Sequence, residues 1–139
     1  MAQHISEIMT ADPITVEPRT TLSEVARLMR DEDFGEVLIS DQDQLRGVVT
    51  DRDLVVRAMA DARDVNSTYA QDVCSSDVVT CAPDAEIDEA VRLMRENAVR
   101  RLPVVDGDEL IGTVTIGDLA LERDPHSALA DVSSAEPNR

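Results

Sequence analysis

Two short segments of the chain carry residue types that could bind a sugar or a phosphate. They read Gly47-Val-Val-Thr-Asp-Arg-Asp53 and Gly112-Thr-Val-Thr-Ile-Gly-Asp118. An Asp in the first turn of a helix can accept hydrogen bonds from two neighbouring ribose hydroxyls, and a Thr hydroxyl beside free helix N–H groups suits a phosphate. The same Thr-x-x-Asp spacing is also a helix-capping arrangement. Spacing alone favours the cap, so ligand contact needs further support.

A ligand with phosphates and a ring would also need cations and an apolar slot. The chain has 13 Lys plus Arg against 29 Asp plus Glu, so only a local arginine cluster could hold a polyanion. Arg52, Arg100 and Arg101 are the phosphate candidates, although a solvated ion pair explains Arg100 equally well. Aromatic side chains are nearly absent, so a ring would lie among aliphatic side chains and backbone; the alternative is that these runs are core strands. The slot candidates are Thr15, Val16, Val37, Thr80, Cys81, Leu102 and Pro103.

An internal repeat indicates how these residues are positioned. Shifting the sequence by 65 residues places 8–57 on 73–122 without a gap. Chance does not explain so many identities without an insertion, so the chain contains two copies of one supersecondary unit. The pairs include Asp12 with Asp77, Thr15 with Thr80, Met29 with Met94, Gly47 with Gly112, Thr50 with Thr115 and Asp53 with Asp118.

Each copy is expected to fold as β-α-β-β-α. A short strand, 14–16 or 78–81, precedes a helix whose apolar residues recur every three or four positions. In the first copy, Thr21 and Glu24 predict a capping box at the start of this helix. Two further strands joined by an acidic turn predict a hairpin, 37–50 or 103–115, and a last helix begins at Thr50 or Thr115.

The predicted fold class is α+β. One unit of about fifty residues cannot cover both faces of its sheet, so we expect the two copies to pack through their sheets about a pseudo-twofold axis. The expected organisation is a first motif at 4–60, a linker at 61–70, a second motif at 71–124 and a tail at 125–139. The tail has little apolar content, and we expect it to fray.

This pattern resembles a tandem pair of CBS motifs, called a Bateman module. The two glycine-to-aspartate segments carry the resemblance, together with Arg101-Leu-Pro-Val-Val-Asp106 and the openings Ile8-Met-Thr and Val73-Cys-Ser. The resemblance covers residues 4–124. In length and order the chain also resembles small stand-alone CBS-pair proteins of the hypoxic-response type.

The resemblance implies a regulatory sensor module rather than an enzyme. Such pairs bind adenosine-containing ligands, of the AMP, ADP, ATP, S-adenosylmethionine or NAD type, in clefts between the motifs, and commonly form homodimers. The ligand would be regulatory, no cofactor would be obligatory, and the output would pass to an unknown effector protein. The alternative is a constitutive dimeric interaction or stress-response protein whose clefts hold no nucleotide.

Composition excludes several other classes. A formal net charge of −16 argues against nucleic-acid partners and against anionic membranes. No apolar run approaches the roughly 20 residues of a membrane span, and the N-terminus lacks a signal pattern, so we expect a cytoplasmic protein. His4 and His126 lie outside the repeats, which disfavours His-based catalysis. Cys74 and Cys81 lack metal-ligand spacing, so no metal site is expected, and a redox role is a minor alternative.

The two copies depart from the CBS pattern in different ways. In the first, Glu36 stands where the second has Arg101, and in the second, Gly117 stands where the first has Arg52. Either cleft could therefore be empty. We also expect a homodimer, because apolar helix faces of a small two-helix layer are hard to cover within one chain. The residues proposed for these faces are Leu22, Val25 and Met29, or Leu54, Ala58 and Met59.

Overall fold

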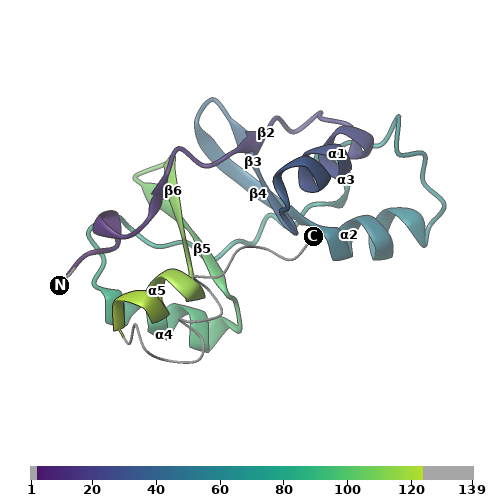
Figure 1. Cartoon of the computed structure of the whole chain (residues 1–139). Helices are drawn as coiled ribbons and strands as arrows, with labels where there is room; N and C mark the ends of the chain where they lie inside the picture. The colour runs from purple at the N-terminus through teal and green to yellow at the C-terminus, as the bar shows by residue number, and fades with distance from the viewer. Residues whose placement is uncertain (1–2, 124–139) are drawn as a thin grey trace. The chain divides into compact units, whose positions relative to one another are not determined.

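The computed structural model describes residues 3–123 and has a mixed α+β fold that divides into two compact units. Unit 1 comprises the described residues of Met1–Pro13 and Val79–Asn138, and unit 2 comprises Ile14–Val78. Figure 1 follows the chain through both. The elements of unit 1 are η1 (Ile5–Glu7), β1 (Thr10–Ala11), α4 (Ile87–Asn97), β5 (Arg101–Asp106), β6 (Glu109–Thr115) and α5 (Ile116–Arg123). Those of unit 2 are β2 (Thr15–Val16), α1 (Leu22–Glu32), β3 (Glu36–Asp41), β4 (Gln44–Thr50), α2 (Asp51–Asp53), η2 (Leu54–Met59) and α3 (Ala70–Val73).

The long helices of the two units start differently but end in the same way. The Thr21 hydroxyl accepts a hydrogen bond from Glu24 N over 3.4 Å, which confirms the Thr21 half of the capping box predicted at the start of α1. Both helices then end at a left-handed residue, Asp33 in α1 and Ala98 in α4, with φ of 58° and 53°. This helix stop turns the chain into the first strand of each hairpin.

The hairpins and their neighbours pair in equivalent registers. β3 and β4 are antiparallel, and so are β5 and β6. The opening strand of each repeat joins parallel to its own hairpin: Val16 is opposite Ile39, and Cys81 makes a single bridge to Val104. The predicted strand at 78–81 is thus reduced to one bridge.

The segment before each opening strand pairs with the hairpin of the other repeat. Thr10 is opposite Thr113 in β6, and Ser75 makes a bridge to Val48 in β4. These two pairs are again related by the 65-residue shift. The compact units therefore divide the chain differently from the sequence motifs at 4–60 and 71–124, because each unit takes in the opening segment of the other repeat. The packing of the two units through their sheets stays a prediction.

The last helices of the two repeats differ. α5 is a regular α-helix, whereas α2 passes after one turn into the π-helix η2. The wider winding continues past η2, since Ala60 N donates to Val55 O over 2.9 Å and Arg63 N to Ala58 O over 3.0 Å. The sequence repeat did not indicate this difference.

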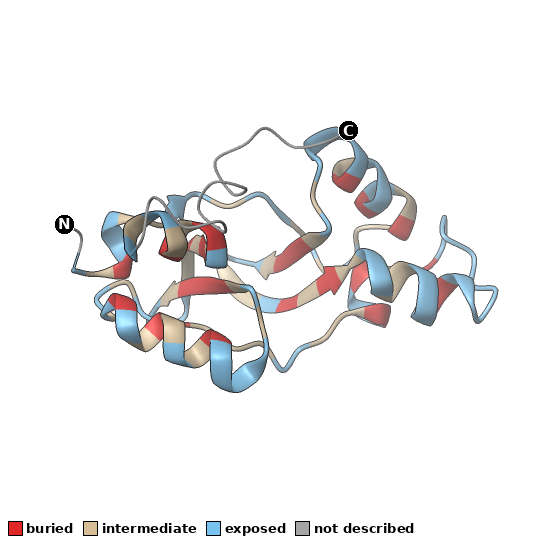
Figure 2. Ribbon diagram, turned by 60° about the horizontal axis from the view of Figure 1, so that its bottom comes forward, coloured by how far each residue is buried: buried red, intermediate tan, exposed pale blue. Residues whose placement is uncertain are grey.

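Each unit has its own hydrophobic core, and Figure 2 shows the buried stripes along the helices and hairpins. The proposed dimer faces need a correction here. Leu22, Val25 and Met29 are buried in the core of unit 2, because the apolar stripe of α1 packs on its own hairpin. Ala58 of η2 is buried in the same core, and Leu54 packs partly buried against it. Met59 is different, since it is 70% exposed.

Candidate functional site at the strand-to-helix junctions

The two Thr-x-x-Asp segments adopt the same local structure. Thr50 N donates to Asp53 Oδ2 over 2.9 Å, and Asp53 N donates to the Thr50 hydroxyl over 3.1 Å. Thr115 and Asp118 repeat these two bonds with the same distances. The capping interpretation is therefore confirmed in both units. Each box uses only one carboxylate oxygen of its Asp, so ligand contact by the other oxygen stays a prediction.

The junction in unit 1 brings the predicted arginines to the start of α5, beside Thr115 and Ile116. Arg101 is directly opposite Thr115 in the β5–β6 register, and the Arg100 carbonyl accepts a hydrogen bond from Ile116 N over 2.8 Å. Arg101 is half-buried and Arg100 is exposed. The hairpin thus positions a guanidinium-bearing residue next to the capping box, as an anion site would require.

The junction in unit 2 is more acidic. Glu36 is opposite Thr50 in the β3–β4 register, at the position that Arg101 occupies in unit 1. The Gly35 carbonyl accepts from Asp51 N over 2.9 Å, and Arg52 N donates to the Asp51 carboxylate over 2.8 Å. Arg52 is exposed. Three acidic residues therefore lie at or beside the first turn of this helix, namely Glu36, Asp51 and Asp53.

Sequence reasoning missed Arg57 in this junction. Its Nε lies 3.6 Å from Asp53 Oδ1, and its Nη1 donates to the carbonyls of Val73 and Cys74 over 3.2 and 3.3 Å. The spacing of four residues from Asp53 is a helical ion-pair signal that the sequence contains. The carbonyl contacts had no such signal, because Val73 and Cys74 are distant in sequence.

The apolar slot candidates belong mainly to the cores. The side chains of Val37, Cys81, Leu102 and Pro103 are buried, and the first three are core members. Their side chains are already packed, which leaves backbone groups for a ligand. The remaining candidates lie at the start of each repeat, where Thr15 is exposed and Val16 and Thr80 are half-buried.

The glycine that precedes each box is required by another chain segment. A Cβ on Gly47 would lie 2.8 Å from the Ser75 carbonyl oxygen, and one on Gly112 would lie 2.8 Å from that of Thr10. Contacts this short with backbone cannot be relieved by a side-chain rotation. The close approach at Gly47 and Gly112 is therefore made by the backbone of Ser75 and of Thr10.

Both thiols are poor nucleophiles at neutral pH. Burial raises the pKa of Cys81 to about 11, and burial also raises the pKa of Cys74. A higher pKa means less thiolate, which is the reactive and metal-binding form. Among residues 3–123, no three His, Cys, Asp or Glu side chains are grouped in a way that could hold a metal ion.

Comparison with known proteins agrees with this doubled architecture. The family model of the CBS domain matches residues 5–59 and again residues 70–123. The chain belongs to the CBS-domain family. The CBS domain-containing protein YhcV of Bacillus subtilis is 35% identical over 133 residues, which cover 93% of this chain and 94% of that protein. The present chain therefore contains a tandem pair of CBS domains.

Solved structures of other CBS proteins resemble this CBS pair. The crystal structure of Hypoxic Response Protein I with two coordinated zinc ions has a TM-score of 0.78 and 35% identity, and the match covers 84% of this chain and 96% of that one. This likeness confirms the resemblance to the hypoxic-response type. The CBS pair of MJ0100, in complex with methylthioadenosine and S-adenosylmethionine, has a TM-score of 0.72 at 24% identity over 84% of this chain and 92% of that one, and so shares the fold.

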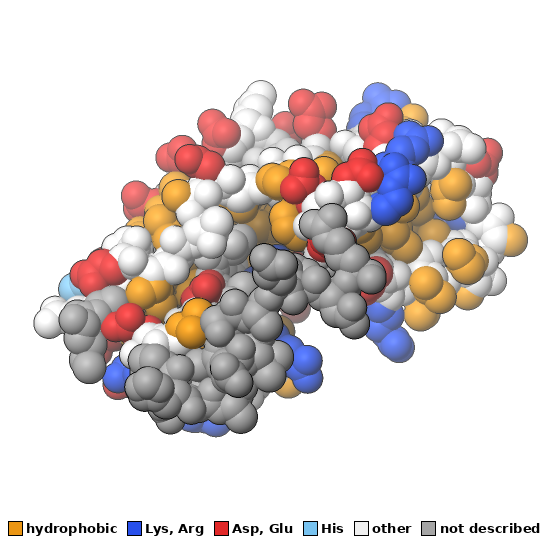
Figure 3. All heavy atoms as spheres, in the orientation of Figure 1, with side chains coloured by type: hydrophobic (Ala, Val, Ile, Leu, Met, Phe, Trp, Pro, Cys, Tyr) orange, Lys and Arg blue, Asp and Glu red, His pale blue; other side chains and the backbone are white. Residues whose placement is uncertain are grey.

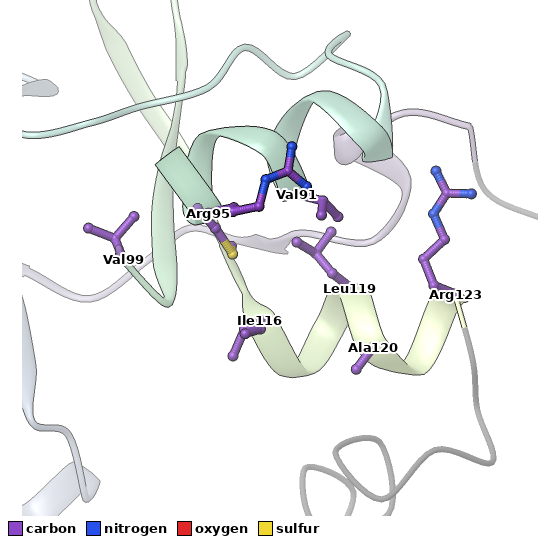
Figure 4. Close-up of a pocket in the computed structure, with 8 residues that line it drawn as sticks. Val91, Arg95, Val99, Ile116, Leu119, Ala120 and Arg123 are labelled. Atoms are coloured by element: carbon purple, nitrogen blue, oxygen red, sulfur yellow. The ribbon is translucent and has the colours of Figure 1, made fainter. Parts of the chain in front are cut away.

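Two helix-lined grooves lie on the surface of this CBS pair, one in each unit. The groove between α4 and α5 measures about 360 Å³, and Figure 4 shows Leu119 pointing from α5 toward α4. The groove beside α1 and η2 measures about 700 Å³. Equivalent repeat positions line both, such as Leu54 and Leu119. Of the helices in residues 3–123, none is long and apolar enough to cross a membrane.

Proposed function

We propose that this CBS pair is a regulatory module rather than an enzyme, and that it binds an adenosine-containing ligand at its strand-to-helix junctions. The ligand class is AMP, ADP, ATP, S-adenosylmethionine or NAD, bound as a regulatory signal and not as an obligatory cofactor. The proposed contacts are Thr15, Val16, Val37, Thr50, Arg52 and Asp53 in unit 2, and Thr80, Cys81, Arg100, Arg101, Leu102, Pro103, Thr115 and Asp118 in unit 1.

One observation carries this proposal. Asp118 is held by its capping box through Oδ2, while its Oδ1 has no hydrogen-bond or ion-pair partner within residues 3–123. The box fixes the direction of the carboxylate, and Arg101 lies opposite Thr115 on the adjacent strand. A fixed carboxylate oxygen suits a ribose diol, and a neighbouring guanidinium suits a phosphate. The complex of MJ0100 supports the ligand class.

The direct test is thermal unfolding with a panel of adenylates and S-adenosylmethionine. A ligand at one hundred times its dissociation constant should stabilise the folded chain by about 2.7 kcal/mol, which raises the melting temperature measurably. If none of the panel shifts the transition, the constitutive dimeric interaction or stress-response alternative is favoured instead.

We predict that Asp118→Ala weakens adenylate binding more than Asp53→Ala. A phosphate senses net charge within about 8–10 Å at physiological salt, and Glu36 and Asp51 lie near the Asp53 junction. Each lost charge-assisted hydrogen bond should cost on the order of 1.5–3 kcal/mol of binding free energy. Calorimetric titration of both variants with the best ligand of the panel measures the difference.

Asn variants separate ligand contact from helix capping. An Asn at position 53 or 118 can still accept the backbone bond through its amide oxygen, but it lacks the carboxylate charge. Asp118→Asn should therefore keep the melting temperature of the ligand-free chain and lose affinity. A larger loss from Asp53→Ala would reverse the ranking, and unchanged affinity in all variants would leave both Asp residues as caps.

We also propose that the chain forms a homodimer and acts on an unknown effector protein. Large apolar side chains are exposed around the groove of unit 2, with Val55 at 53%, Met59 at 70% and Val65 at 44%. Figure 3 shows hydrophobic side chains gathering over the helix that starts at α2. Apolar patches beside a groove are typical of association surfaces.

The dimer can be tested with one added charge. Met59→Asp should raise the dimer dissociation constant by at least about tenfold, because a carboxylate would be buried without a partner. Sedimentation at concentrations on the order of tens of micromolar should detect a dimer of the wild-type chain. Ala82→Asp adds the same charge at an exposed position of unit 1 and should leave the dimer intact. A wild-type monomer at these concentrations would exclude a stable interface.

A further inference from the structure

The two junctions also differ at the position four residues after the Asp. In unit 2 this residue is Arg57, and the equivalent residue of unit 1 is Glu122. Asp53 has one oxygen in its capping box, and its other oxygen, Oδ1, lies 3.6 Å from Arg57 Nε. The Asp53 side chain is 13% exposed. Both of its oxygens are thus engaged within the chain.

Arg57 also donates hydrogen bonds to the backbone at the end of α3. Its Nη1 donates to Val73 O and Cys74 O, at the C-terminal end of α3, where a cation is favourable. The next residue, Ser75, exchanges two backbone hydrogen bonds with Val48, each of 2.9 Å. The guanidinium therefore connects the Asp53 junction to the backbone segment that lies on β4.

The equivalent position of unit 1, Glu122, cannot make the same contacts. The positions that match Val73 and Cys74 are Ile8 and Met9, and the segment around them pairs with β6 in the same way. A Glu at position 122 cannot donate to carbonyl oxygens, because a carboxylate is an acceptor. The repeat thus keeps the fold of the junction but places the guanidinium in unit 2 alone.

We propose that Arg57 is a positioning residue with two roles. In its closing role it occupies Asp53 Oδ1, and as a clamp it holds the Val73–Cys74 backbone by hydrogen bonds. As a result, an adenosine ligand occupies the Asp118 junction first. This inference rests on the proposed function for its ligand part. A ligand that takes Asp53 must displace Arg57 from Oδ1. One planar guanidinium contacts both Asp53 Oδ1 and the carbonyls of Val73 and Cys74. Displacing it from Asp53 therefore also weakens its hydrogen bonds to the backbone just before Ser75.

The clamp can be tested without any ligand, by hydrogen exchange of the full chain. Arg57→Met keeps an unbranched apolar stem but removes all donors, and the amides of Cys74 and Ser75 should then exchange about threefold to tenfold faster. Arg46→Met removes one exposed arginine elsewhere in unit 2 and should leave these amides unchanged. Unchanged exchange in Arg57→Met would overturn the clamp.

A lysine variant distinguishes the guanidinium geometry from charge alone. The single ammonium of Arg57→Lys can approach Asp53 or the two carbonyls, but it lacks the fork that reaches both. We expect this variant to recover less than half of the lost protection at Cys74 and Ser75. Full protection of the Cys74 and Ser75 amides would show that charge is sufficient. It would overturn the proposal that one guanidinium must reach both Asp53 and the two carbonyls.

The closing role is tested by titration calorimetry with ATP, AMP and S-adenosylmethionine. The wild-type chain should bind one equivalent of ligand, and Asp118→Asn should lose it. Arg57→Met should bind a second equivalent of ligand, and this second equivalent should disappear when Asp53→Asn is added. Two equivalents in the wild type, or one still bound in Arg57→Met, would overturn the closing role. If no probe binds any variant, the proposed function and the closing role both fail, whereas hydrogen exchange still decides the clamp.

Discussion

Leu102→Ala should lower the free energy of unfolding of the ligand-free chain by about 2–5 kcal/mol. Leu102 is fully buried and is a member of the core of unit 1, together with Val104 and Val114. Truncation removes its apolar contacts and leaves a cavity that the surrounding hairpin and α4 can fill only partly. Equilibrium unfolding in urea, followed by circular dichroism, measures the loss.

Two matched variants make this result informative. Val37 is the equivalent residue of unit 2 and is equally buried, so Val37→Ala should also destabilise, but less, because fewer methyl and methylene groups are removed. Val55→Ala, at a side chain 53% exposed, should change stability by less than about 0.5 kcal/mol. If Leu102→Ala and Val37→Ala left the ligand-free chain unchanged, these residues would serve a ligand rather than the cores.

Gly47→Ala and Gly112→Ala should each cost about 1–3 kcal/mol of stability. The added methyl group would lie 2.8 Å from a backbone carbonyl oxygen, of Ser75 in one unit and of Thr10 in the other. To remove this close contact, the segment around Ser75 would have to move away from β4, or the segment around Thr10 away from β6. Either movement would weaken the backbone hydrogen bonds between the segment and the strand. Urea unfolding of each variant gives the cost.

Gly35→Ala is the matched control for this effect. A Cβ at this position would meet the Asp51 carboxylate at 3.3 Å, and a side chain can move by a few tenths of an ångström. Gly35→Ala should therefore destabilise the chain less than Gly47→Ala or Gly112→Ala. If Gly47→Ala were as mild as Gly35→Ala, the segment at Ser75 would not be tightly held against β4, which would also weaken the case for the clamp by Arg57.

Much of the local structure could be predicted because its causes are local in sequence. The Thr21 cap, the Thr50–Asp53 and Thr115–Asp118 boxes and the two hairpins each depend on residues a few positions apart. The 65-residue shift then required the boxes and the hairpins to occur twice, and they do, whereas the cap does not recur, because Glu86 makes no side-chain cap at the start of α4. The family resemblance was equally readable, because it rests on these same short segments.

Only the tertiary structure decided which distant segments meet. An apolar strand pattern does not name its partner, so the pairing of Thr10 with β6 and of Ser75 with β4 could not be read from either repeat. For the same reason Leu102 and Val37 were equally consistent with a ligand slot or a core, until the packing placed them in the cores. The partners of Arg57 followed from this long-range pairing, because its guanidinium reaches carbonyls sixteen and seventeen residues away that only the folded segment brings within hydrogen-bond distance.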